Sequence, residues 1–322
     1  MPFHITAVNE DFQVYIQQND PKGLKVNLKY ATASGIDIPG SDSFTNTYTS
    51  SYSNPVRISL KEGESIYFIP VTDRNKFYTL DGSTIYFNQF RIEGSNNCTF
   101  NVAGNIMSLL YADFSNKFSL ADDPCAFCNL FSGASNIVGP KMVSAGGLLL
   151  PATELSKNCY ANMFSNSYGL TEAPELPATT LSESCYSQMF QKCWVLTEAP
   201  ELPATTLADR CYFDMFSGCK ALEKAPELPA TTLTDRCYYE MFLGCLALEK
   251  APELPATTLA NYCYYRMFSN CPVLKEAPKL PATTLADYCY AEMFHSCKAL
   301  EEAPELPATT LADRCYLNMF YE

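Results

Sequence analysis

The chain has 322 residues, a net charge of −13, 47% hydrophobic residues and 18% charged residues. This length is enough for two domains that each bury a core, and the composition excludes both a disordered chain and a highly charged one. The excess of acidic side chains argues against a phosphate-binding surface, so nucleic acid is not an expected partner. No apolar run approaches the length of about 18 residues that a membrane span requires, so none is expected.

The first residues, MPFHITAVNEDF, do not have the basic and apolar segments of a secretory leader. Two explanations stay open. Either a leader has been removed, or the protein reaches its destination by another route, for example as part of a virion assembled in the cytoplasm.

Alternation of apolar and polar residues predicts β-strands in the first hundred residues. The runs are Phe12 to Ile16, Leu24 to Tyr30, Val56 to Leu60, Ile66 to Val71 and Ile85 to Ile92. Gly63 in the KEGES link predicts a hairpin turn, and the polar stretch from Ser41 to Asn54 is expected to be a mobile loop. These features predict an all-β sandwich domain over residues 1–104.

A junction and a degenerate N-terminal repeat cap are predicted for residues 105–149. The segment NLFSGASNI, Asn129 to Ile137, resembles the MFSGCKAL of the later repeats, with Ala134 in place of the second cysteine. A longer loop, VGPKMVSAGG, precedes the first regular unit.

Internal repeats define the rest of the chain, residues 150–322. The string LPAT recurs every 26 residues, at Leu150, Leu176, Leu202, Leu228, Leu254, Leu280 and Leu306. Units of this kind bury their apolar side only against their neighbours, so the pattern predicts a solenoid.

One unit, Leu228 to Glu253, illustrates the predicted secondary structure. Leu233, Cys237 and Met241 recur at intervals of four, which predicts one face of a short helix that ends at Gly244. Beyond it, a segment with two prolines predicts a short extended strand. One brief strand and one brief helix per unit make an α/β solenoid of the leucine-rich-repeat type.

The repeated pattern CYxxMFxGCxxLxxAPxLPATTL resembles the BspA-like leucine-rich repeats, the Treponema pallidum type, of Bacteroidetes and other host-associated bacteria. GNIMSLLY, Gly104 to Tyr111, is similar to a junction in Bacteroides proteins of this group. The resemblance covers roughly residues 104 to 322, although the units here are longer than is usual in that family. It implies a solenoid on the cell surface, or otherwise extracellular, that binds host proteins or other cells and has no catalytic residues to carry over.

Three hypotheses for function follow. The first is an adhesion or attachment module that binds a protein or glycan on a host or cell surface. The second is a virion decoration or fibre protein, because related repeat proteins look like components of phages that infect these bacteria. The third is a glycan-acting enzyme with its site in the N-terminal sandwich, which lacks a convincing acid–base pair there.

The fifteen cysteines are expected to be reduced core thiols rather than disulfides or metal ligands. Most form pairs eight residues apart, such as Cys185 and Cys193, which a helix would hold about 12 Å apart, beyond disulfide reach. Disulfides between adjacent units are the alternative. The one CxxC, Cys125 with Cys128, has no second ligand pair beside it, so no metal and no cofactor is predicted.

Catalytic chemistry has few candidates. His4 lies at the terminus, and His295 occupies a slot that other units fill with serine or leucine, which is typical of a tolerated surface residue. No catalytic or phosphate-binding motif appears. Paired glutamates recur in every unit, as a solubilising stripe or as a surface for a basic partner or weakly held Ca²⁺.

Binding specificity is expected where the units differ, because identical rows offer identical contacts. Lys275 and Lys279 reverse the charge of the acidic stripe in one unit. Aromatic and arginine side chains, which favour interfaces, fill other variable slots. The candidate binding residues are Trp194, Arg210, Phe213, Arg236, Tyr239, Tyr262, Tyr265, Arg266, Lys275, Lys279 and Tyr288. The alternative is that the aromatic side chains only cover neighbouring coils.

The last unit ends without a closing strand, at Tyr321 and Glu322. An uncapped solenoid exposes apolar side chains, so we expect either a truncated chain or a self-association or docking surface at this end.

Overall fold

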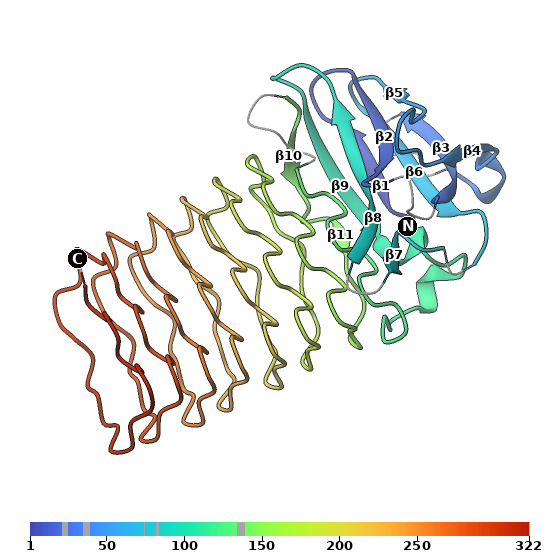
Figure 1. Cartoon of the computed structure of the whole chain (residues 1–322). Helices are drawn as coiled ribbons and strands as arrows, with labels where there is room; N and C mark the ends of the chain where they lie inside the picture. Colours follow the sequence, from blue (N-terminus) through green and yellow to red (C-terminus); the bar gives the residue numbers. More distant parts are fainter. Residues whose placement is uncertain (21–24, 35–38, 74, 82–83, 134–138, 322) are drawn as a thin grey trace.

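The computed structural model describes residues 1–20, 25–34, 39–73, 75–81, 84–133 and 139–321. A two-sheet β region occupies about the first 150 residues, and a stack of coils follows it (Figure 1). None of the helices in these described ranges has both the length and the apolar character needed to cross a membrane.

The larger sheet has the strand order β10-β9-β1-β6-β3-β4, and β11 also pairs with β9. Its strands are β1 (His4–Ala7), β3 (Asn27–Ser34), β4 (Asn46–Thr49), β6 (Glu64–Pro70), β9 (Thr99–Asn105), β10 (Lys141–Ser144) and β11 (Leu148–Leu149). The smaller sheet has the order β5-β2-β8-β7, with β2 (Phe12–Gln18), β5 (Ile58–Leu60), β7 (Tyr78–Asp81) and β8 (Thr84–Glu93). Short 3₁₀ helices cover Ser41–Ser43 (η1), Ile106–Leu109 (η2) and Phe114–Asn116 (η3).

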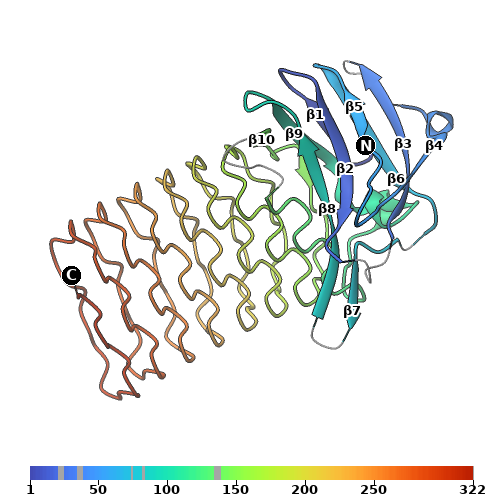
Figure 2. The same cartoon turned by 45° about the horizontal axis from the view of Figure 1, so that its top comes forward.

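The strands of both sheets are seen in Figure 2, and aromatic side chains pack between the two sheets. Phe3, directly before β1, and Phe68 on β6 each lie with their ring centroids 5.3 Å from that of Phe90 on β8. Phe90 in turn stacks on Phe131, which belongs to the first coil. The sandwich and the coils therefore share one apolar core, which continues through both parts of the chain.

The junction depends on a close approach of backbone segments at Gly104. This residue has φ +83°, and a Cβ there would lie 2.1 Å from the carbonyl oxygen of Pro2. Its N–H donates to the carbonyl of Gly147, and Leu148 of β11 pairs with it in a parallel bridge. Only glycine fits this position. The larger sheet thereby continues beyond residue 104 into β10 and β11.

The sequence-based strand predictions are confirmed where they can be compared. All five predicted runs overlap β2, β3, β5, β6 or β8, although Leu24 lies outside the described residues. The strands β1, β4, β7, β9, β10 and β11 were not predicted. The Gly63 turn forms, but it is not a hairpin, because β5 and β6 belong to different sheets.

The loop predicted from Ser41 to Asn54 is wrong. It contains η1 and β4, and β4 pairs antiparallel with β3. The reason is Tyr48, which is buried and whose hydroxyl accepts from the N–H of Ile16 at 2.7 Å and donates to its carbonyl at 3.2 Å. The burial and hydrogen bonds of Tyr48 thus hold this stretch in the sheet despite its polar composition.

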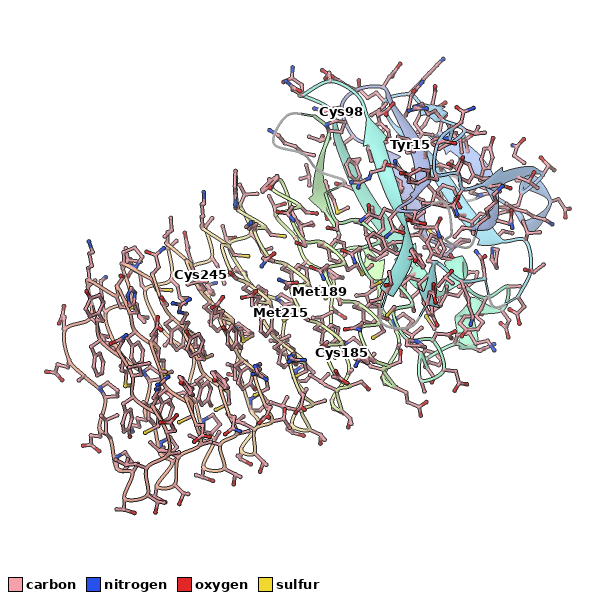
Figure 3. The ribbon with its side chains drawn as sticks, in the orientation of Figure 1. Tyr15, Cys98, Cys185, Met189, Met215 and Cys245 are labelled. Carbon is pink, nitrogen blue, oxygen red and sulfur yellow. The ribbon has the colours of Figure 1, made fainter. Side chains whose placement is uncertain are left out.

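The 26-residue units are stacked coils. Equivalent tyrosines from Tyr160 to Tyr316 form one column with ring centroids 5.7–6.0 Å apart. Equivalent phenylalanines from Phe131 to Phe320 form a second column with centroids 5.6–5.8 Å apart. Methionines and cysteines fill the interior between coils, among them Met189 and Met215 (Figure 3).

The helix predicted in each unit is wrong, because residues 209–219 and their equivalents form a chain of tight turns instead, called here the turn run. In residues 184–192, alternate N–H groups donate to carbonyls three residues back, and the others donate to the next coil. Every fourth residue is left-handed, as at Arg236, Glu240 and Gly244. A four-residue turn period places the same side chains inside as a helix of 3.6 residues per turn over this short length.

The predicted strand of each unit is also not formed as a ladder. Residues 223–229 and their equivalents, called here the proline run, are extended, since exposed and buried side chains alternate from Glu227 to Thr231. Only isolated parallel bridges join neighbouring runs, such as Glu198 with Lys224. Prolines lack the N–H that a ladder requires.

The predicted cap resemblance is confirmed for the described part of Asn129 to Ile137, and residues 134–137 lie outside it. Phe131 stacks on Phe164 with centroids 5.6 Å apart, and Phe127 stacks on Tyr160. This first coil begins before Asn129 but within the predicted junction and cap, since Leu120 already donates its N–H to the carbonyl of Glu154 in the next coil.

Candidate binding surfaces

The six proline runs form one side of the solenoid, which we call the proline face. The runs cover residues 171–177, 197–203, 223–229, 249–255, 275–281 and 301–307. In the central coils, the leucine of each run is buried, whereas the glutamate before it and the proline after it are exposed, as for Leu228 between Glu227 and Pro229. The face thus presents columns of glutamate and proline to solvent.

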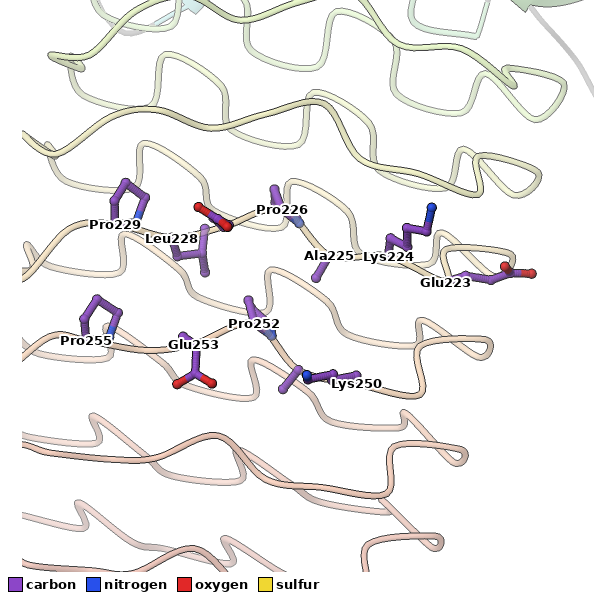
Figure 4. A pocket seen from close by; sticks show the side chains of 12 residues that line it. Glu223, Lys224, Ala225, Pro226, Leu228, Pro229, Lys250, Pro252, Glu253 and Pro255 are labelled. Atoms are coloured by element: carbon purple, nitrogen blue, oxygen red, sulfur yellow. The ribbon is translucent and has the colours of Figure 1, made fainter.

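Grooves lie between neighbouring proline runs. One groove has a volume of about 540 Å³ and is lined by residues of runs 223–229 and 249–255. Pro226 and Pro229 of one run lie beside Pro252 and Pro255 of the next (Figure 4). Similar grooves of about 430 Å³ and 500 Å³ lie between runs 197–203 and 223–229 and between runs 275–281 and 301–307. The same apolar channel therefore repeats along the face.

The proline face carries most of the negative charge of the repeats. Residues 150–322 hold 22 acidic and 12 basic side chains, a net charge of −10. The six proline runs alone hold twelve glutamates and four lysines, a net charge of −8. The acidity that the sequence assigns to the repeats is thus concentrated on one side of the coils.

The two candidate lysines on this face differ in their contacts. Lys275 pairs with Glu249 of the preceding coil at 2.8 Å, as Lys224 pairs with Glu198 at 2.5 Å. Lys279 lines the groove between runs 275–281 and 301–307 and occupies the column of the exposed glutamates. Lys279 is therefore the residue that reverses the charge in the column of exposed glutamates, because the charge of Lys275 is paired with that of Glu249.

The turn runs carry most of the other candidate residues, in neighbouring columns that we call the turn face. Phe213, Tyr239 and Tyr265 stack with centroids 4.6 and 4.8 Å apart, and Tyr262 stacks on Tyr288 at 4.6 Å. The ring planes within these columns differ by no more than 22°. Stacked rings cover one another's faces. The hydroxyl of Tyr265 donates to Glu292 at 3.1 Å, and that of Tyr288 accepts from Arg314.

Arginines and carboxylates complete this face. The guanidinium of Arg236 lies 4.7 Å from the ring centroid of Tyr262. Arg266 bridges Glu240, at 3.5 Å, and Glu292, at 2.7 Å, from the coils on either side of it. These contacts link one coil to the next, as the alternative interpretation of the aromatic slots requires.

Trp194 lies apart from these columns. The half-buried Trp194 lies with its centroid 4.3 Å from that of Tyr168, and the Lys220 ammonium lies 4.1 Å from its ring. Arg210 is exposed at the start of its turn run. The other aromatic and arginine candidates share the turn face, since Arg210 occupies the position equivalent to Arg236 in the preceding coil, whereas the two lysines lie on the proline face.

Sequence reasoning missed Asp214, a buried carboxylate on the turn face. Its Oδ2 accepts hydrogen bonds from the side-chain amides of Gln188 and Gln191, at 3.2 and 3.4 Å, and its Oδ1 is buried without a partner. Burial and the adjacent Glu240 carboxylate raise the pKa of Asp214 to about 7. The signal in the sequence was an acid at equivalent positions of consecutive units, 214 and 240.

The cysteines are all described, and each is a buried free thiol. Cys219 donates its thiol hydrogen to the carbonyl of Phe190 at 3.1 Å, and equivalent cysteines repeat this contact with the preceding coil. Burial raises the pKa of Cys237 to about 12, which keeps it protonated. The predicted burial of the thiols is confirmed.

The CxxC pair lies outside these interior columns. Cys125 and Cys128 are buried against Tyr78 and Ala161. The hydrogen bond from the Cys128 thiol lowers the pKa of Cys125, and the same contact together with burial raises that of Cys128. No group of three or more His, Cys, Asp or Glu side chains in the described ranges is placed to hold a metal ion.

The two histidines have structural contacts. His4 is buried, its ring stacks on Tyr67 with centroids 4.7 Å apart, and burial lowers its pKa. His295 is partly exposed and stacks on Tyr321. At the last coil, Leu311 is 64% exposed and Phe320 is 42% exposed, so apolar side chains do lie open there.

Comparison of the chain with protein-family models, with curated proteins and with solved structures found no match.

Proposed function

We propose that the chain is a non-enzymatic attachment module that binds a protein or glycan on a host or cell surface through its coils. The observation that carries this proposal is the proline face, on which apolar grooves and an acidic column repeat from coil to coil. A repeated surface of this kind multiplies weak contacts along an extended partner.

We further propose that the coils belong with the BspA-like leucine-rich repeats and act on the cell surface or outside the cell. The support is the repeated CYxxMFxGCxxLxxAPxLPATTL pattern and its period of 26 residues. The leucines of this pattern, such as Leu222, Leu228 and Leu233, are buried in the solenoid interior, as that repeat plan requires.

The proposed function is tested by incubating the labelled full chain with arrays of host matrix proteins and glycans. We expect saturable binding to one class of target, competed by unlabelled chain, with the target released unchanged. Release of a cleaved glycan would identify an enzyme instead, and a lack of any saturable binding would contradict the proposal.

A further inference from the structure

The grooves of the proline face exist because the chain cannot form a backbone ladder there. At one end of a run, the N–H of Ala199 donates to the carbonyl of Lys224, and at the other end that of Thr205 donates to Thr179. Between them, Pro200 and Pro203 have no N–H, and no backbone hydrogen bond of residues 200–204 joins the neighbouring coils, all of which are described. Neighbouring runs are therefore held only at their ends.

Each groove combines an apolar lining with a charged rim. Ala225, Pro226 and Pro252 line the groove of about 540 Å³. Its charged lining is three carboxylates and two ammonium groups, from Glu223, Glu227, Glu253, Lys224 and Lys250. This arrangement complements a side chain with an apolar stem and a cationic end, which is the description of lysine and arginine. The net charge of −8 on the face attracts such a partner from a distance.

The spacing of the coils is close to that of alternate side chains in an extended polypeptide. Equivalent rings in successive coils are 5.6–6.0 Å apart, which is the spacing of the coils through the interior. Alternate side chains of an extended polypeptide are roughly 6.6 Å apart and point to the same side. A strand laid along the solenoid can thus place every second side chain in successive grooves.

We propose that the proline face binds an extended, basic polypeptide segment whose alternate lysine or arginine side chains enter successive grooves. This inference rests on the proposed attachment function and names the chemistry of its partner. The footprint covers the uninterrupted glutamate column Glu175, Glu201, Glu227 and Glu253, and it ends where Lys279 reverses the charge.

The test uses the full chain and a fluorescent peptide of alternating lysine and threonine that is long enough to span this column. Fluorescence anisotropy gives its affinity, and a peptide of the same composition with all lysines in one block is the sequence control. We expect the alternating peptide to bind and the block peptide to bind more weakly, since only the first matches the groove spacing.

Variants locate the site. Glu227→Lys removes one attraction and adds one repulsion, so we expect the alternating peptide to lose about tenfold in affinity. Asp313→Lys changes the net charge of the chain equally, but at an exposed position outside the proline runs, and is expected to leave the affinity within about twofold. Lys279→Glu extends the column and is expected to tighten binding.

Equal binding of both peptides, or an equal loss in Asp313→Lys and Glu227→Lys, would mean that only the overall charge attracts cations, and it would overturn the inference. The proposed function is separable from it. Saturable binding to an array target that persists while the alternating peptide does not bind would refute the groove inference alone. A failure of both assays would refute both proposals.

Discussion

The buried side chain of Asp214 makes the stability of the folded chain depend on pH. Its pKa of about 7 in the folded chain exceeds the value of about 3.9 of an unfolded aspartate. The folded state therefore binds a proton that the unfolded state does not, between about pH 4 and 7. As the pH rises through this window, stability falls because the unfolded chain releases its proton while the folded chain keeps it. Above about pH 7 the folded chain also loses the proton, and the full cost of a buried carboxylate beside Glu240 remains.

The variant Asp214→Asn tests whether stability falls with rising pH because of this carboxylate. Compared with the wild type, we expect it to raise the free energy of unfolding by roughly 2 to 4 kcal/mol at pH 8 and to have little effect near pH 4. Urea unfolding at both pH values measures the difference. Asp313→Asn, at an exposed carboxylate, is the control, and a gain for Asp214→Asn that does not depend on pH would show that the buried charge is not its cause.

The column of buried tyrosines yields a second residue-scale prediction, because the hydroxyl of Tyr238 is buried without a hydrogen-bond partner. Removing it in Tyr238→Phe should leave the free energy of unfolding unchanged or raise it by about 1 kcal/mol. Tyr48→Phe is the matched comparison, since it breaks two hydrogen bonds to Ile16 and should lower stability by about 1 to 3 kcal/mol. A loss in Tyr238→Phe as large as that in Tyr48→Phe would reveal a hydrogen bond in the interior column.

For single residues, the sequence predicted which side chains are buried better than it predicted which side chains contact one another. The interior cysteines could be assigned because thiols recurring with apolar residues favour a core. The environment of Asp214 could not, since its hydrogen-bond donors Gln188 and Gln191 come from the preceding coil. Nor could the partners of the candidate arginines, because Arg266 is paired only when coils at 240 and 292 flank it.

At the scale of elements, the turn run explains why a helix was predicted and is absent. Cys237 and Met241 face the interior in either structure, because two turns of helix and two four-residue turns have nearly the same period. Hydrogen bonds between coils favour the tight turns over a helix, because the N–H groups of Tyr186 and Gln188 donate to carbonyls of the next unit. Those bonds connect residues 25 apart and leave no mark on the local pattern.

The interior phenylalanine column gives the prediction for elements. Phe242 is fully buried between Phe216 and Phe268, whereas Phe320 in the last coil has one ring neighbour in this column and is 42% exposed. Phe242→Ala should therefore lower the free energy of unfolding by about 3 to 5 kcal/mol, and Phe320→Ala by well under half of that. Equal losses in thermal or urea unfolding would contradict the stacked interior.

For the whole molecule, the period of 26 predicted a stack of coils after a β region, and both are present. The sandwich was predicted less completely, because β1, β9, β10 and β11 are short or polar and become strands only through pairing across the chain. The grooves also escaped prediction. The two prolines of each run were assigned to a strand, although their missing N–H groups separate neighbouring runs.

Each coil is joined to the next by hydrogen bonds along its turn run, but by none across the middle of its proline run, residues 200–204 and their equivalents in the described coils. Residue-resolved amide hydrogen exchange of the full chain tests this most directly. We predict slow exchange at Tyr186, Gln188 and Phe190 and their equivalents in every inner coil, and fast exchange at Glu201 and Leu202 and their equivalents. Uniform protection across both runs, as a continuous parallel sheet would give, would contradict the account.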